Sequence, residues 1–64
     1  MNKEEKIQYL EKIWNQIFEI GIDLVNFKQL EGLVLVDGIN NHFYKMDDCL
    51  LSARVHIVEI QRKL

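Results

Sequence analysis

Side chains of types that bind metals occur in the second half of the chain at His42, Asp47, Asp48, Cys49 and His56. Their spacing does not suit a metal site. On one helix, Cys49 and His56 would lie about 10 Å apart along the axis, whereas the ligands of a zinc ion lie about 2.0–2.3 Å from the metal. The sequence has no Cys-x-x-Cys pair and no His-x-x-x-His pair. We therefore predict no metal and no cofactor.

Ser52 and His56 are the remaining pair with possible chemistry, because residues four apart can touch on one helix face. Nucleophilic catalysis also needs an oxyanion hole and a third group that orients the base. No glycine-rich turn precedes Ser52, and the three glycines are too far apart for a phosphate-binding loop. A chain of 64 residues is also short for a substrate cleft. We therefore predict that the protein is not an enzyme and has no catalytic residues.

The size and composition of the chain predict one small domain, 1–64, that needs a partner. Chains of this length bury only about 60% of their unfolded surface, so they are marginally stable alone. Cys49 is the only cysteine, which rules out an internal disulfide, while 48% of the residues are hydrophobic. The sequence shows no apolar leader and no run of about 18 or more apolar residues. These features predict a cytoplasmic protein that does not enter membranes.

The elements that must position these side chains begin with a helix over about 3–20. Asn2 can cap this helix, because Glu5 follows at the spacing of a capping box. Gly21 is well placed to end it. The apolar residues that recur at helical spacing are Ile7, Leu10, Trp14 and Ile17.

The middle of the chain allows two interpretations. Apolar spacing favours a second helix over about 24–36, with Gly38 as its stop. Asp37-Gly38 between apolar runs is instead typical of a β-hairpin over 33–44. The second arm of such a hairpin, 39–44, does not alternate cleanly between apolar and polar residues. The pattern therefore favours the break between helices, and the hairpin remains an alternative.

The last predicted helix, about 47–63, is apolar on two sides. Asp47 or Asp48 can cap it, and Arg62 and Lys63 suit its C-terminal end. One stripe comprises Leu50, Ala53, Ile57, Ile60 and Leu64, and the other Leu51, Val55 and Val58. One stripe would complete the core with Trp14 and Ile17, and the other would form the seam of a homodimer. The predicted interface residues are therefore Leu50, Leu51, Val55, Ile57, Val58, Ile60 and Leu64.

The sequence thus predicts an all-α domain of three helices that forms a homodimer. By elimination, its predicted function is protein–protein interaction, as a small regulator or inhibitor of bacterial or phage type that binds a larger protein such as a transcription factor or enzyme. The alternative is a dimeric, helical DNA-binding regulator. Nucleic acid is the less favoured partner, because the net charge is −2 and the Lys and Arg residues are scattered. No resemblance to a known family is specific enough to name.

Overall fold

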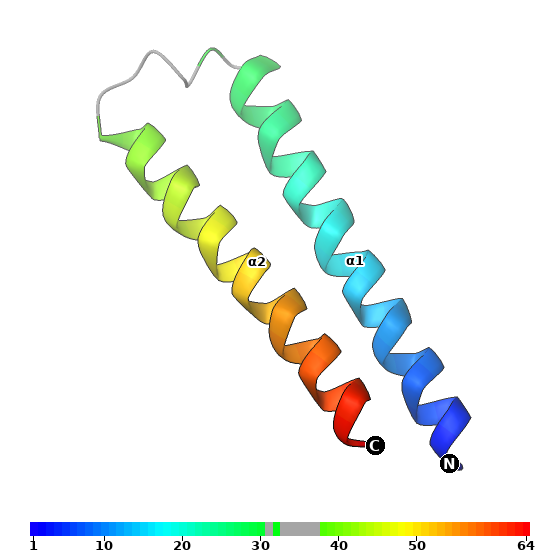
Figure 1. Ribbon diagram of the computed structural model, residues 1–64. Helices are drawn as coiled ribbons and strands as arrows, with labels where there is room; N and C mark the ends of the chain where they lie inside the picture. Colours follow the sequence, from blue (N-terminus) through cyan, green and yellow to red (C-terminus); the bar gives the residue numbers. More distant parts are fainter. Residues whose placement is uncertain (31, 33–37) are drawn as a thin grey trace.

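Two long helices run antiparallel, side by side, and form a helical hairpin (Figure 1). Helix α1 spans Lys3–Leu30 and helix α2 spans Ile39–Lys63. The computed structural model describes residues 1–30, 32 and 38–64. Both termini lie at the same end of the hairpin (Figure 1).

Helix α1 begins where the sequence predicts. The side chain of Asn2 accepts a hydrogen bond of 2.8 Å from the backbone N–H of Glu5, which confirms the predicted cap. After the helix ends, Gly32 has a φ of 65° and donates its backbone N–H to the carbonyl of Gln29. A left-handed glycine at this place is a common way to end a helix.

The prediction of three helices is wrong, and Gly21 is the first reason. Gly21 lies inside α1 and does not end it. A glycine costs a helix about 1 kcal/mol relative to alanine. Here the position faces α2, because a Cβ atom built on Gly21 would lie 3.9 Å from the Leu50 side chain. The first predicted helix and the start of the second, over 24–30, are therefore one helix.

The predicted boundaries of the second and third helices are also wrong. Helix α2 begins at Ile39, eight residues before the predicted start at Asp47. Asp47 is therefore an exposed residue inside the helix and does not cap it. The residue that precedes the helix is Gly38, with a φ of 86° and no side-chain cap. Because 39–44 is helical, the predicted second arm of the β-hairpin is not a strand. The end of the predicted second helix and the first arm of the predicted hairpin fall mainly on 31 and 33–37, which lie outside the described residues.

The hairpin is elongated and has almost no interior of its own. Its principal extents are 47 × 17 × 11 Å, and its radius of gyration is 15.0 Å. A compact chain of this length would have a radius of gyration of about 11 Å. Among the described residues only Ile57 is buried, with 8% of its surface exposed. Neither described helix has an apolar stretch long enough to cross a membrane.

Candidate interaction surfaces

The two helices meet through a repeat of seven residues, and one edge of their contact contains polar side chains. Gln61 donates a hydrogen bond of 3.0 Å from its Nε2 atom to the carbonyl of Ile7. One repeat further along, the guanidinium of Arg54 lies 5.4 Å from the ring centre of Trp14. The next residues in the two series, Gly21 and Asp47, line the same hollow. Seven residues make about two helical turns, so each series stays on one side of its helix.

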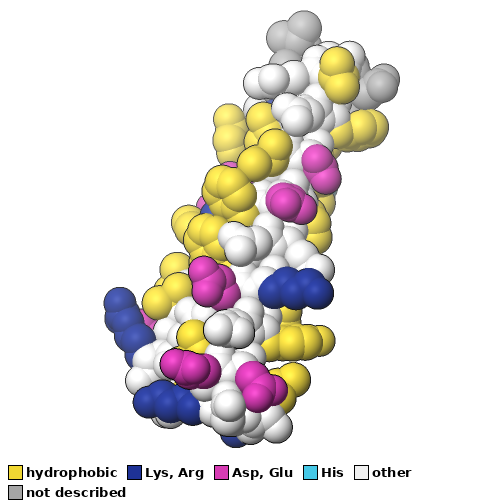
Figure 2. Space-filling model, turned by 90° about the vertical axis from the view of Figure 1, so that its right-hand side faces the viewer, with side chains coloured by type: hydrophobic (Ala, Val, Ile, Leu, Met, Phe, Trp, Pro, Cys, Tyr) yellow, Lys and Arg dark blue, Asp and Glu magenta, His cyan; other side chains and the backbone are white. Residues whose placement is uncertain are grey.

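The other edge of the contact is apolar. Its residues also repeat every seven positions, and they are Leu10, Ile17 and Leu24 on α1 with Phe43, Leu50 and Ile57 on α2. All six are buried or half-buried. The hairpin therefore has two different sides, one next to the polar edge and one next to the apolar edge. Figure 2 views α1 from its outer side and shows apolar side chains along both margins, with charged side chains between them.

The side next to the polar edge is hollowed, and we call it the groove face. It comprises Phe18, Ile22, Val25, Leu51, Arg54 and Val55. One hollow of about 270 Å³ lies between Phe18, Val25 and Arg54. A second, of about 290 Å³, lies between Trp14, Arg54 and Val55. Arg54 thus separates two open hollows that are lined mainly by apolar side chains.

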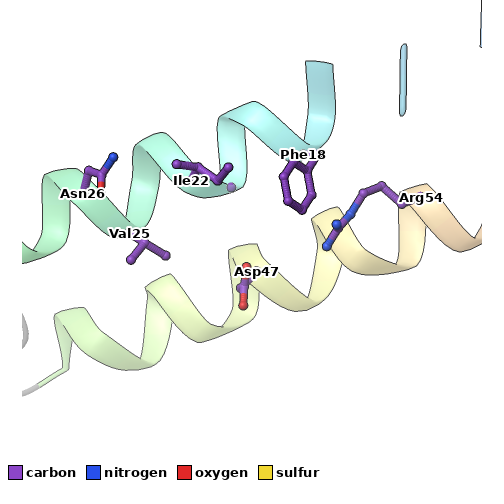
Figure 3. A pocket seen from close by; sticks show the side chains of 7 residues that line it. Phe18, Ile22, Val25, Asn26, Asp47 and Arg54 are labelled. Carbon is purple, nitrogen blue, oxygen red and sulfur yellow. The ribbon is translucent and has the colours of Figure 1, made fainter. Parts of the chain in front are cut away.

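Arg54 is the central charged group of the groove face. Its guanidinium lies 5.3 Å from the ring centre of Phe18 as well as 5.4 Å from that of Trp14, and the two rings stack at 5.6 Å. Figure 3 shows Phe18 on α1 and Arg54 on α2 turned toward the same gap between the helices. The Nε atom of Arg54 is buried, and no described residue accepts a hydrogen bond from it. These contacts hold the cation by its apolar stem and aromatic neighbours and leave its hydrogen-bonding capacity partly unused.

A second cation is held in the same way near the connection between the helices. The Nζ atom of Lys28 lies 5.2 Å from the ring centre of Tyr44 and 5.9 Å from that of Phe43. Phe43 also packs against Phe27, with ring centres 6.4 Å apart. Lys28 is half-buried as a result. This aromatic cluster packs the two helices together at the connected end of the hairpin.

From Leu10 to Phe27 on α1 and from Ile39 to Ile60 on α2, the side next to the apolar edge is lined by apolar residues, and we call it the apolar face; Lys6 lies one repeat before Ile13, beyond its N-terminal end. The apolar face comprises Ile13, Ile20, Phe27, Ile39, Met46, Ala53 and Ile60. Most of these residues lie three positions after a residue of the apolar edge, which places them on the same side of the helix. Ile20 and Ile60 are each 49% exposed and Phe27 is 52% exposed. The structure therefore leaves Ile20, Phe27 and Ile60 half-exposed on this face, while Ile13 and Ala53 are half-buried.

The structure divides the seven predicted interface residues among three places. Ile57 and the half-buried Leu50 face α1, and Leu64 follows them at the C-terminal end. Ile60 lies on the apolar face. Leu51 and Val55, 53% and 52% exposed, lie on the groove face, next to the half-buried Val58. The interface role of these residues stays a prediction.

The residues with possible chemistry lie outside the groove face, but Cys49 and His56 each follow a residue of the apolar face, Met46 and Ala53, by three positions. Ser52, His56 and Cys49 are exposed on α2. In the described part of the chain, no three His, Cys, Asp or Glu side chains gather in a way that could hold a metal ion. The residue that sequence reasoning missed is Arg54, which it counted only among the scattered Lys and Arg residues. The signal that could have found it is its position seven residues before Gln61, in a series that parallels the one of Ile7 and Trp14 on the other helix.

Comparisons with known proteins give no relative. The chain matches no protein-family model, no curated protein and no solved structure at a significant level.

Proposed function

We propose that the protein is a small protein–protein interaction module, a cytoplasmic regulator or inhibitor of bacterial or phage type that binds a larger protein. The observation that carries this proposal is the groove face. There, an open hairpin presents two hollows with aromatic walls and one partly unused cation between them. Tryptophan and arginine in such a setting are the residue types that contribute most to binding between proteins. The single exposed thiol of Cys49 fits a reducing compartment.

The shape of the groove face favours an amphipathic helix as the bound element. An added helix would pack against both α1 and α2 and turn the two-helix hairpin into a three-helix bundle. Its apolar residues would fill the hollows beside Phe18 and Val55. An acidic residue near its middle would pair with the guanidinium of Arg54, which lines both hollows. In this binding mode an amphipathic helix lies in a groove and contacts it through apolar residues three and four positions apart.

The test uses a photo-reactive amino acid at Val55, with the same group at Ser52 as control. Both residues are exposed on α2, but only Val55 lines the groove face. In a lysate of the organism that encodes the chain, we expect the probe at position 55 to cross-link one larger protein. We expect the probe at position 52 to leave that protein unlabelled. The captured protein is then purified for a direct affinity measurement.

Matched aspartate substitutions complete the test. We expect Leu51→Asp to weaken binding of the purified partner by roughly tenfold or more, because it places a charge against an apolar surface. Ser52→Asp adds the same charge one residue away, on the outer side of α2, and should leave affinity unchanged. Equal affinities for the two variants, or no partner captured from position 55, would refute the proposal.

A further inference from the structure

The apolar face and the groove face differ in composition, and the difference bears on what covers each. From Leu10 to Phe27 on α1 and from Ile39 to Leu64 on α2, the apolar edge and the apolar face together contain no charged or polar side chain. The groove face and its polar edge contain Arg54, Asp47 and Gln61. Interfaces of permanent homodimers are more apolar than those of transient complexes, and charged residues are depleted at their centres. The apolar face has the composition of the first class.

The exposed area of the hairpin has the size that a dimer requires. The chain exposes 5154 Å² to solvent. A compact monomer of 7.6 kDa would expose only about 4,300 Å². The excess, about 850 Å², is close to the roughly 800 Å² that each partner buries in an interface of standard size. The elongation of the hairpin thus leaves about one standard interface of surface uncovered.

We propose that the apolar face is the seam of a homodimer, in which two hairpins pack face to face as a four-helix bundle. The interface is isologous: the same patch of each copy, centred on Ile20, Met46 and Ala53, meets itself across a two-fold axis. The patch is free of charge, so two copies meet without like-charge repulsion. Association buries the half-exposed Ile20, Phe27 and Ile60 and gives the bundle the interior that one hairpin lacks.

A second copy fits this face better than a different protein does. The seven residues that define the face offer no charge and no hydrogen-bonding side chain by which to select one partner among many, and Cys49 and His56 lie at its margin. A permanently exposed apolar surface of this kind also promotes aggregation. Pairing with a second copy of the chain would cover it. The sequence pattern leaves both stripes of the last helix open as the seam, and one of them is Leu51, Val55 and Val58. The charge distribution of the structure favours the side of the hairpin opposite that stripe. This inference is independent of the proposed function, because the two use opposite faces.

The experiment is sedimentation equilibrium of the full 64-residue chain and two matched variants over the micromolar range. Ile20→Asp and Val55→Asp place the same charge on a β-branched residue of similar exposure, 49% and 52%, on opposite faces. We expect the wild type to sediment at twice its chain mass of 7.6 kDa. We expect Ile20→Asp to weaken dimerisation by roughly 100-fold or more, because the charge would be buried at the seam. Val55→Asp should remain a dimer.

A second measurement keeps the result clear if Ile20→Asp unfolds. A photo-reactive amino acid at position 20 should yield a cross-linked species of twice the chain mass, and the same group at position 55 should not. The melting temperature of the wild type should also rise with concentration, since association adds to the free energy of unfolding. A monomeric wild type, a dimeric Ile20→Asp variant, or cross-linking from position 55 in place of position 20 would each overturn the proposal.

Discussion

Ile57 is the residue on which the packing of the two helices depends most. It is the single buried side chain among the described residues, with 8% of its surface exposed. It lies on the apolar edge of the contact, where α2 meets α1. Small domains have a free energy of unfolding of only a few kcal/mol. A hairpin with one buried side chain therefore has little reserve against a cavity at this position.

We expect Ile57→Ala to lower the free energy of unfolding by about 2–5 kcal/mol, because it removes three buried carbon atoms and leaves a cavity. Chemical denaturation followed by circular dichroism measures the change. Val55→Ala is the control: Val55 is 52% exposed, and surface substitutions usually change stability by about 0.5 kcal/mol or less. If the two variants were equally stable, Ile57 would not be the centre of the core.

The predicted role of Trp14 and the missed role of Arg54 show what sequence patterns reveal about single residues. Trp14 belongs to an apolar series at helical spacing, so its place at the helix contact follows from the sequence alone. Arg54 belongs to the same contact through its aromatic neighbours, but a charged residue interrupts the apolar pattern that guides such predictions. An arginine is buried when its apolar stem and its guanidinium pack against side chains of another helix. The sequence does not reveal which side chains of α1 these are.

At the scale of the helices, the sequence predicts the outer ends and not the inner boundaries. The start near Lys3 and the end at Lys63 follow from the Asn2 cap and from the last apolar and basic residues. The inner errors share one cause. Gly21 resembles a helix stop, and Asp47 resembles a helix cap, when only neighbours in the sequence are considered. Contacts between α1 and α2 extend both helices through these positions, because tertiary packing outweighs differences of about 1 kcal/mol in local propensity.

The glycines allow a direct test of this explanation. We expect Gly21→Ala to raise the free energy of unfolding by about 1 kcal/mol, because alanine favours a helix. The added methyl group would meet Leu50 at 3.9 Å, an ordinary van der Waals distance. We expect Gly32→Ala to lower the stability by about 1–2 kcal/mol, because its φ of 65° is unfavourable for a residue with a Cβ atom.

Thermal unfolding of both glycine variants, at one protein concentration, measures these changes. Opposite shifts in melting temperature are expected from the same chemical substitution. A loss of stability in Gly21→Ala would mean that the two helices approach more closely at this point than the structure shows.

The shape and charge of the whole molecule bear on the two predicted classes of partner. DNA recognition by a helix-turn-helix needs two helices that cross at about 90–120° and a basic helix that enters the major groove. The described helices are instead antiparallel. Of the eight Lys and Arg residues, Lys28 and Arg54 lie over aromatic rings, and Arg62 is paired with Glu59 at 3.0 Å. The net charge of the whole chain, with all eight cations included, is −2.

We therefore expect only weak binding to random duplex DNA at physiological salt, measured by the fluorescence anisotropy of a labelled duplex. Each phosphate contact that a basic protein makes releases condensed counterions, so the logarithm of affinity falls by about 0.9 per contact for each tenfold rise in salt. Because the other five cations are scattered along the chain, few of them could contact one duplex at the same time, and the slope for this chain should be shallow. A basic DNA-binding protein of similar size is the control for the labelled duplex. Tight binding with a steep slope would favour the DNA-binding regulator, and Lys3, Lys6, Lys12, Lys45 and Lys63 would then be the residues to substitute first.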